Sequence, residues 1–318
     1  MMKYINLQGY QETIKVSRLA MGSAMSMMRL SEDVITNLFD IYLDAGGNCL
    51  DTARSYGEGK CESLVANYLK KTGKRNQVVL TTKGCHPRNE SMNVSRLGKA
   101  DMTEDINLSL GTFGVDFFDL YWIHKDDESI PVEEIVDNMN EILVKPGKVR
   151  ALGCSNWHKE RIEAANQYAK ESGQAGFLAS QIQWSLAETK EEYFKEFGAV
   201  VMSDDSYDWY LKNQMPVFAF SSQAQGFFPR AAAGIETLPP MMQKNYVNEA
   251  NKIRLERVKA LAEKNQMSLS APTLGYIVNN RLPSVAIIGA EDPDMLRQSL
   301  EGAEISMTED EADELFRV

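Results

Sequence analysis

The 318-residue sequence has few of the residues that form disulfide frameworks or hold metal ions. Its four cysteines contain no CxxC pair and stand at Cys49, Cys61, Cys85 and Cys154. Only three histidines occur, His86, His124 and His158. Residues so dispersed lack the ligand spacing of zinc sites and the cysteine spacing of disulfide-rich domains. We therefore expect neither a metal site nor a disulfide framework.

Long apolar runs are also missing. No stretch approaches the roughly 20 consecutive apolar residues that a membrane-spanning helix needs. The amino terminus, "MMKYINLQGYQETIKVS", lacks the apolar central run and the small-residue cleavage site of a secretory signal. With 43% hydrophobic and 25% charged residues, the composition is that of an ordinary globular protein. We expect no membrane segment and a cytoplasmic location.

An excess of basic residues is absent as well. The chain has 34 Lys and Arg against 45 Asp and Glu, which gives a formal net charge of −11. No Lys/Arg stripe interleaved with aromatic residues offsets this charge, so a phosphate backbone would be repelled. This argues against a nucleic-acid partner. No helical stripe or charged face indicates an oligomer interface, and the sequence leaves the oligomeric state open.

What the chain does contain is an alternation of short apolar runs with amphipathic segments. Segments such as "SEDVITNLFDIYLDAG" carry apolar residues at i, i+3, i+4 and i+7, as helices do. Parallel strands need crossovers of roughly a dozen residues, which helices supply. The pattern predicts a single-domain (β/α)₈ TIM barrel over residues 1–318, with an open doubly wound sheet as the alternative. The eight strands are expected at 18–22, 47–51, 78–83, 117–124, 149–155, 178–183, 216–221 and 284–289.

Two segments interrupt the repeat. Residues 1–16 alternate polar with apolar side chains around Gln8-Gly9, which predicts a β-hairpin that closes the bottom of the barrel. A long connection, residues 222–283, separates the seventh and eighth strands and contains "GFFPRAAAGIETLPP". We interpret the part at 222–245 as a candidate lid, because the strand pattern resumes after this connection.

Four polar residues lie at or just after consecutive predicted strand ends, which in a parallel barrel is where active sites are built. Asp51 ends the second strand, Tyr56 follows five residues later, Lys83 ends the third strand and His124 ends the fourth. A phenol with a pKa near 10 is a poor acid at neutral pH, and a nearby ammonium lowers its pKa. Lys83 is placed to do this for Tyr56, with Asp51 keeping the lysine charged and His124 orienting a carbonyl oxygen.

Each residue alone has a structural explanation. Asp51 suits a helix N-cap, Lys83 a solvated loop, Tyr56 a packed aromatic and His124 a hydrogen-bonded core histidine. Their joint placement at successive strand ends favours a proton-transfer site.

Five segments together resemble the aldo-keto reductase family: "LDTARSYG", "TTKG", "DLYWIHKDD", "GCSNW" and "QIQWS". "LAMGSA", "VFAFSSQAQG" and "SVAIIGAEDPDMLRQSL" extend the resemblance from end to end. It implies an NAD(P)H-dependent reductase of aldehydes or ketones, or the reverse, in which Tyr56 is the general acid/base. A small-molecule carbonyl or alcohol is then the substrate. Because the branch of the family that reduces carbon–carbon double bonds has glutamate in place of His124, the histidine favours carbonyl chemistry.

The resemblance also implies cofactor contacts. Hydrogen bonds to the nicotinamide carboxamide are expected from Ser155, Asn156 and Gln181, and ring stacking from Phe220. Ser221, Ala224 and Gly226 match a pyrophosphate loop, and Gly22 and Ser23 a ribose contact.

The adenine end departs from the family pattern. The matching positions there are Gly289, Ala290, Glu291, Met295, Gln298 and Ser299. Met295 replaces a frequent arginine, and Glu291 would repel a 2′-phosphate but accept a hydrogen bond from a bare 2′-hydroxyl. The family expectation is NADP(H), NAD(H) is the alternative, and Arg297 or Arg230 is available to restore the charge.

Substrate contacts are less well specified. Met25, Trp122, Trp157 and Trp184 are candidate pocket residues, although such side chains are more often core. Residues 84–101 and 222–245 are expected to shape the mouth. A non-enzymatic alternative is a cofactor-binding regulatory subunit of the same fold, like the channel-associated members of the family.

Overall fold

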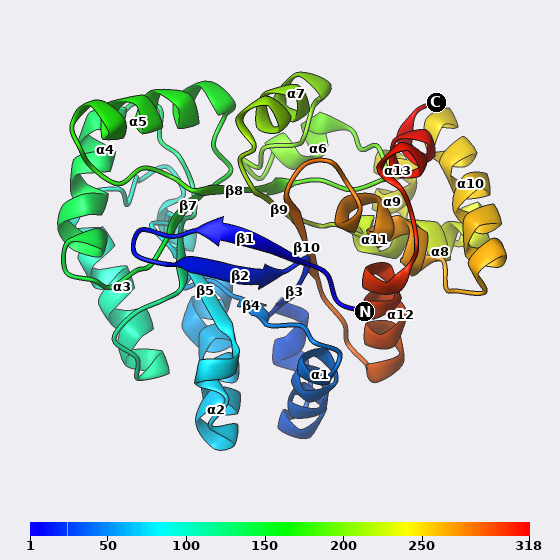
Figure 1. Ribbon diagram of the computed structural model, residues 1–318, viewed down its shortest axis with the longest axis horizontal. Helices are drawn as coiled ribbons and strands as arrows, with labels where there is room; N and C mark the ends of the chain where they lie inside the picture. Colours follow the sequence, from blue (N-terminus) through cyan, green and yellow to red (C-terminus); the bar gives the residue numbers. More distant parts are fainter. Residues whose placement is uncertain (24) are drawn as a thin grey trace.

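The structure, a computed structural model, describes residues 1–23 and 25–318, without the side chain of Met25. Eight parallel strands form a closed barrel in the order β10-β3-β4-β5-β6-β7-β8-β9 (Figure 1). The (β/α)₈ barrel is therefore confirmed and the open sheet is excluded. The strands are β3 (Leu19–Gly22), β4 (Cys49–Asp51), β5 (Val79–Gly84), β6 (Leu120–Ile123), β7 (Leu152–Ser155), β8 (Ala179–Gln183), β9 (Val217–Phe220) and β10 (Ser284–Ile288).

Each strand lies inside or within one residue of its expected range. The largest difference is at β6, which was expected to begin at residue 117 but begins at Leu120. Phe118 forms only an isolated bridge with Val149, because the ladder between β6 and β7 starts at Tyr121 and Leu152.

Helices surround the barrel on its outside (Figure 1). They are α1 (Glu32–Asp44), α2 (Lys60–Thr72), α3 (Lys99–Phe113), α4 (Val132–Met139), α5 (Lys159–Glu171), α6 (Glu191–Lys195), α7 (Asp204–Asn213), α8 (Phe227–Ala233), α9 (Pro240–Tyr246), α10 (Glu249–Asn265), α11 (Ser270–Val278), α12 (Pro293–Glu304) and α13 (Glu309–Phe316). Capping explains several ends: Ser31 accepts from Val34 N at the start of α1, and Gly73 is left-handed after α2. None of the helices in the described residues is long and apolar enough to cross a membrane.

The predicted hairpin is present as β1 (Tyr4–Gln8) and β2 (Thr13–Ser17), and it lies across one end of the barrel (Figure 1). Its alternating apolar side chains, including Leu7 and Val16, join a buried cluster with residues inside the barrel such as Leu120 and Phe218. The second cluster lies between the outer faces of the strands and the helices. Because strand side chains alternate, one set of positions fills the barrel and the other packs against helices.

The connection between β9 and β10 is long, as expected, but mostly helical. The candidate lid segment contains α8, α9 and the short 3₁₀ turns Ala224–Gly226 and Ile235–Thr237. Side chains of α8, α9 and α10, including Phe228, Tyr246 and Leu255, are buried. Part of this connection therefore belongs to the packed outer layer.

Candidate active site

The four residues singled out at strand ends come together at the carboxyl end of the barrel. Side chains alternate along a strand, so Val79, Thr81 and Lys83 share one face of β5. Val79, at the start of this strand, belongs to the apolar cluster inside the barrel. The same alternation puts Leu120, Trp122 and His124 on one face of β6 and the residue after it. The ionisable member of each series, Lys83 or His124, is its last, so it lies at the mouth instead of in the apolar core.

Asp51 is the centre of the hydrogen-bond network. Its Oδ2 lies 2.5 Å from Lys83 Nζ, and its Oδ1 accepts from Thr81 Oγ1 at 2.7 Å and from Gln181 Nε2 at 3.2 Å. Lys83 Nζ also donates to the Thr52 carbonyl at 2.8 Å. Both charged groups are buried, with side chains 1% and 5% exposed. This arrangement fixes the ammonium, since buried charges are tolerated only when paired and hydrogen-bonded.

The lysine ammonium lies 5.0 Å from the centre of the Tyr56 ring. Burial raises the pKa of Tyr56 above its ordinary value, while the positive charge of Lys83 opposes that change. Burial would lower the pKa of Lys83, but Asp51 and then Tyr56 outweigh it, so the pKa is raised and the lysine stays charged. Lys83 acts to lower the pKa of Tyr56, as the sequence predicts, but burial has the larger effect and the pKa is raised. Tyr56 is therefore a neutral phenol that is able to donate a proton.

His124 lies beside the phenol. The two rings are 5.8 Å apart, edge to face, and His124 Nδ1 is 3.3 Å from Ser55 Oγ. Burial, then the charge of Lys83 and the neighbouring His86, lowers the pKa of His124 well below its ordinary value. The imidazole is therefore neutral at physiological pH and suited to hydrogen bonding with a carbonyl oxygen instead of protonating it.

A cavity of about 770 Å³ opens over this group. Asp51, Tyr56 and His124 line it, while Lys83 lies beneath. Of the residues assigned to the cofactor, all but the buried Ala224 line the same cavity. They are Gly22, Ser23, Ser155, Asn156, Gln181, Phe220, Ser221, Gly226, Gly289, Ala290, Glu291, Met295, Gln298 and Ser299. One continuous cavity thus joins the proton-transfer group to the segment after β10.

Backbone geometry along the cavity is unusual for residues with side chains. Positive φ angles occur at Asn156 (60°), Ser221 (51°), Ala224 (47°) and Gln225 (57°). Such conformations cost energy outside glycine and concentrate at functional sites. Asn156 is secured there by its own amide, which accepts from Val200 N at 3.2 Å and donates to Ser155 Oγ at 3.1 Å.

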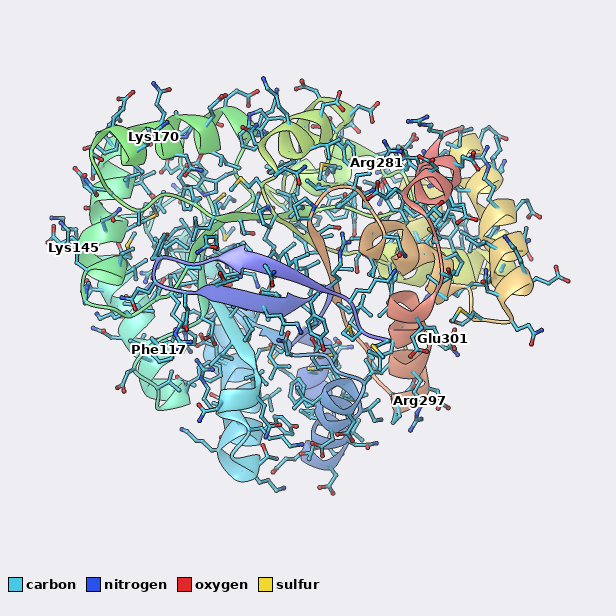
Figure 2. The ribbon with its side chains drawn as sticks, viewed as in Figure 1. Phe117, Lys145, Lys170, Arg281, Arg297 and Glu301 are labelled. Atoms are coloured by element: carbon cyan, nitrogen blue, oxygen red, sulfur yellow. The ribbon has the colours of Figure 1, made fainter. Side chains whose placement is uncertain are left out.

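The far end of the cavity carries mixed charge. Glu291 and Arg230 both line it, and Arg230 is its one arginine or lysine among the described residues. Arg297 is not at the cavity: it pairs with Asp294 at 3.0 Å and extends from the outside of α12 (Figure 2). Asp292 caps α12 by accepting from Met295 N at 2.8 Å. Of the two arginines considered from sequence, only Arg230 lines the cavity.

The structure places three tryptophans of the weakest sequence assignments outside the main cavity. Trp122 is fully buried below the site and donates to Thr81 Oγ1 at 3.1 Å, and Trp157 packs against Phe177. Trp184 is buried against Tyr276. None of the three lines the main cavity. Trp157 and Trp184 instead line two separate cavities. The side chain of Met25, the fourth candidate, lies outside the described residues.

Sequence reasoning missed His86 and Gln223. His86 lines the cavity, and its ring centre is 4.8 Å from that of His124. Gln223 also lines it and donates to Ser299 Oγ at 2.7 Å, which links the segment after β9 to α12. The segment after Lys83 was recognised as part of the mouth, but nothing local to the sequence indicated which of its side chains turns inward.

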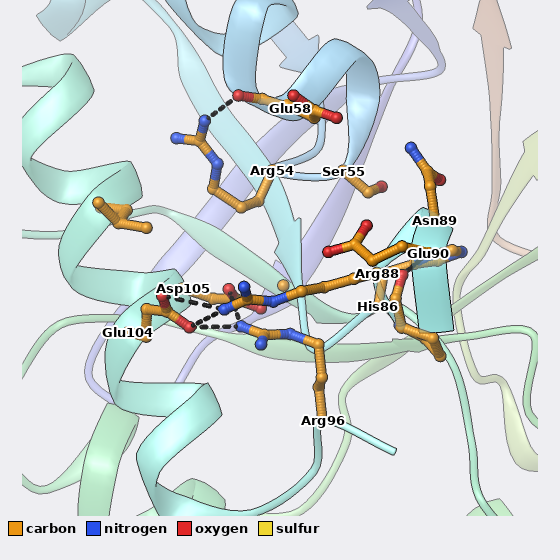
Figure 3. Close-up of a pocket in the computed structure, with 13 residues that line it drawn as sticks. Arg54, Ser55, Glu58, His86, Arg88, Asn89, Glu90, Arg96, Glu104 and Asp105 are labelled. Carbon is orange, nitrogen blue, oxygen red and sulfur yellow. Dashed lines mark hydrogen bonds and ion pairs between the residues drawn. The ribbon is translucent and has the colours of Figure 1, made fainter. Parts of the chain in front are cut away.

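A smaller cavity of about 390 Å³ adjoins this group through His86. It is enclosed by the loops that follow β4 and β5 and by α3 (Figure 3). We call it the polar recess. Its lining residues are Arg54, Ser55, Glu58, Gly84, His86, Pro87, Arg88, Asn89, Glu90, Arg96, Glu104, Asp105 and Leu108.

Comparisons with known proteins agree with this geometry. Residues 18–318 match the model of the aldo/keto reductase family. An aryl-alcohol dehydrogenase of Pestalotiopsis microspora is 23% identical over 95% of this chain and 79% of its own length. A probable aryl-alcohol dehydrogenase of Saccharomyces cerevisiae is 25% identical over 91% of this chain and 88% of its own. A putative voltage-gated potassium channel β-subunit of Schizosaccharomyces pombe is 25% identical over 92% of this chain and 86% of its own.

The family match covers nearly the whole chain, and the barrel with its strand-end polar group has the form that the resemblance implied. These findings support an oxidoreductase that interconverts carbonyls and alcohols. The chain belongs to the aldo/keto reductase family.

Proposed function

We propose that the protein reduces an aldehyde or ketone to an alcohol, or runs the reverse reaction, with Tyr56 as the general acid/base. The observation that carries this proposal is the buried pair of Asp51 and Lys83, 2.5 Å apart, directly under the Tyr56 ring. The fixed ammonium makes proton donation by this buried phenol easier than burial alone would allow, because it stabilises the phenolate that remains.

The substrate carbonyl is held between Tyr56 and His124. The neutral imidazole hydrogen-bonds to the carbonyl oxygen and orients it, and the Tyr56 hydroxyl gives that oxygen a proton as negative charge develops on it. Lys83 keeps its charge throughout because Asp51 and the Thr52 carbonyl remain bound to it. In the reverse direction the Tyr56 phenolate removes the alcohol proton.

The residues along the cavity fit a nicotinamide dinucleotide, which supplies or accepts the hydride when bound. Ser23 Oγ is buried without a hydrogen-bond partner among the described residues, as expected of a group reserved for a ligand. The side-chain amide nitrogen of Gln181 donates a hydrogen bond to Asp51. The amide oxygen of Gln181 therefore remains available to accept a hydrogen bond from the nicotinamide carboxamide. The left-handed residues Ser221, Ala224 and Gln225 curve the backbone as in anion-binding turns. We propose NADP(H), with Arg230 at the 2′-phosphate, and NAD(H) as the alternative favoured by Glu291.

One relative favours a second candidate function. The Schizosaccharomyces pombe protein is named as a potassium channel β-subunit, and this chain covers 86% of it. A regulatory subunit would bind the cofactor and turn over little substrate. The complete proton-transfer group favours the enzyme.

The deciding experiment compares wild type with Tyr56→Phe. Wild type should oxidise NADPH or NADH in the presence of an aldehyde panel. The variant should lose at least about 100-fold in kcat, in line with removal of a general acid, while calorimetry shows unchanged cofactor binding. An undiminished rate in Tyr56→Phe contradicts the mechanism. Tight cofactor binding without turnover of any carbonyl, with a stoichiometric partner, favours the regulatory subunit.

A further inference from the structure

Ser55 stands directly before Tyr56, and its hydroxyl does not cap the turn that follows it. The residue precedes the short 3₁₀ turn Tyr56–Gly59, where a serine side chain usually accepts from a free backbone N–H, yet it makes no such bond. Among the described residues, its hydroxyl contacts only Nδ1 of His124, at 3.3 Å. The serine side chain therefore meets the reacting group instead of stabilising the turn.

One strand fixes the backbones on both sides of this contact. The backbone N–H of Arg54, the residue before Ser55, donates to the Lys83 carbonyl at 2.9 Å. The backbone N–H of His124 donates to the next carbonyl of β5, that of Gly84, at 2.9 Å. Main-chain hydrogen bonds to adjacent residues of one strand thus hold the hydroxyl next to the imidazole.

The two ring nitrogens of His124 have different surroundings. Ser55 lines the polar recess, and its hydroxyl meets Nδ1. His124 itself lines the main cavity, where the substrate carbonyl is expected. Among the described residues only Ser55 hydrogen-bonds to this ring. The nitrogen available to a carbonyl oxygen is therefore Nε2.

The position of one hydrogen on His124 decides what Nε2 can do. Burial, and then the charge of Lys83, holds the pKa of His124 well below its ordinary value, so the ring is neutral. A neutral imidazole carries a hydrogen on one nitrogen and a lone pair on the other. Only a hydrogen at Nε2 can be donated to a carbonyl oxygen, because a lone pair there would face the lone pairs of the oxygen.

The hydrogen bond at Nδ1 selects between these two tautomers. If the Ser55 hydroxyl donates, its proton and the Nδ1 lone pair are both used, and the hydrogen at Nε2 is left for a ligand. If the hydroxyl accepts instead, its own proton and the Nε2 lone pair both lack a partner among the described residues. Donation by Ser55 satisfies more of these polar groups.

We infer that the Ser55 hydroxyl donates a hydrogen bond to His124 Nδ1 and thereby fixes the Nε2–H tautomer, the form that can bind the substrate carbonyl oxygen. Ser55 is a positioning residue, because it acts on the substrate only through His124. This inference rests on the proposed carbonyl reduction.

Nuclear magnetic resonance of ¹⁵N-labelled histidine tests the tautomer directly, because the chain has only three histidines. In wild type at neutral pH, His124 should have its hydrogen at Nε2. His86 should have the opposite pattern, because its Nδ1 lies 2.7 Å from the Pro87 carbonyl, which only accepts. His124→Gln identifies the signals of His124 by their loss. In Ser55→Ala these signals should shift toward a mixture of tautomers.

Steady-state rates with an aldehyde that wild type reduces test the consequence. Ser55→Ala should lower kcat about threefold to tenfold, the value of one hydrogen bond, with cofactor affinity unchanged. Ser55→Thr keeps the hydroxyl and should retain both the Nε2–H signal and a kcat within about twofold of wild type. If Ser55→Ala does not fold, Ser55→Cys, whose thiol is a weak donor, replaces it and should change both readouts in the same direction.

Ser172→Ala is the matched control, since it removes an exposed serine hydroxyl at the end of α5 that touches neither cavity. It should leave the tautomer of His124 and kcat unchanged. A wild-type His124 with its hydrogen at Nδ1 overturns the inference. A folded Ser55→Ala protein that keeps the wild-type tautomer or the wild-type kcat also overturns it.

Failure of the proposed function gives a different result. If wild type reduces no aldehyde, the tautomer spectra of wild type and Ser55→Ala still test the contact. An Nε2–H signal that is lost in Ser55→Ala supports the role of Ser55 without carbonyl reduction, and a signal independent of Ser55 overturns it.

Discussion

The guanidinium of Arg54 lies 2.7 Å from the carboxylate of Glu62, whose side chain is fully buried. Arg54 Nη2 also donates to the Glu58 carbonyl at 2.6 Å. A Cβ atom at Gly59 would lie 1.2 Å from this guanidinium. Arg54 precedes Tyr56 in the chain, and its side chain contacts the turn that follows Tyr56. Residues 57–59 of this turn all have left-handed backbone conformations.

This contact predicts that Arg54 positions Tyr56. Arg54→Lys cannot reach both Glu62 and the Glu58 carbonyl, and the turn should relax. We expect kcat to fall roughly tenfold to 100-fold, the range that misplacement of a catalytic group produces, with cofactor affinity unchanged. Arg257→Lys, on the exposed face of α10, is the control. Gly59→Ala should reproduce the defect by displacing the guanidinium. Normal kcat in both site variants would show that the turn holds its shape alone.

The Asp51–Lys83 pair gives a prediction about stability. Lys83→Met leaves a buried carboxylate without its cation, which costs about 3–5 kcal/mol in the free energy of unfolding. Urea titration of Lys83→Met and of Asp51→Asn/Lys83→Met measures this cost. The double variant should regain a large part of the loss, because its amide carries no charge to desolvate. Equal stability of the two variants would mean that Thr81 and Gln181 suffice to hold the carboxylate.

The lowered pKa of His124 predicts a pH dependence of stability. Below about pH 6.5 the unfolded chain binds a proton at this residue while the folded chain does not, so stability falls as the pH falls, by up to roughly 1.4 kcal/mol per pH unit. Unfolding free energies of wild type and His124→Gln should therefore converge or cross between pH 7 and pH 5. A constant difference across that interval would mean that His124 titrates normally in the folded protein.

Arg230 gives a prediction about cofactor choice. Arg230→Ala should weaken NADPH binding by about tenfold or more, the value of one charge-assisted hydrogen bond to phosphate, and leave NADH unaffected. Arg297→Ala should bind both like wild type, because Arg297 is paired with Asp294 outside the cavity. Calorimetric titration of wild type and of both variants with NADPH and NADH measures the six affinities. NADH binding tighter than NADPH in wild type would favour Glu291 as the determinant and NAD(H) as the cofactor.

Sequence reasoning succeeded where a local pattern decides the outcome. The eight strands and the hairpin follow from alternation and from turn residues, which depend on neighbours within a few positions. Asp51, Lys83 and His124 were found because a parallel barrel collects the carboxyl ends of its strands at one face. Side-chain alternation then directs these residues into the mouth.

Sequence reasoning failed where packing between distant segments decides the outcome. Trp122, Trp157 and Trp184 are side chains typical of a pocket wall, yet all three are buried away from the main cavity. Arg230 and Arg297 are equally basic in the sequence, but only Arg230 reaches the cavity. His86 became visible only with its ring next to His124.

The sequence by itself determined the barrel, the hairpin and the identity of the residues at the strand ends, because periodicity and chain direction are local properties. Tertiary structure alone decided the direction in which the pKa of Tyr56 shifts. Burial raises this pKa, and the charge of Lys83 only partly opposes the change. It also decided which side chains line the two cavities. The physical reason is that desolvation and ion pairing depend on atoms brought together from strands and loops far apart in the chain.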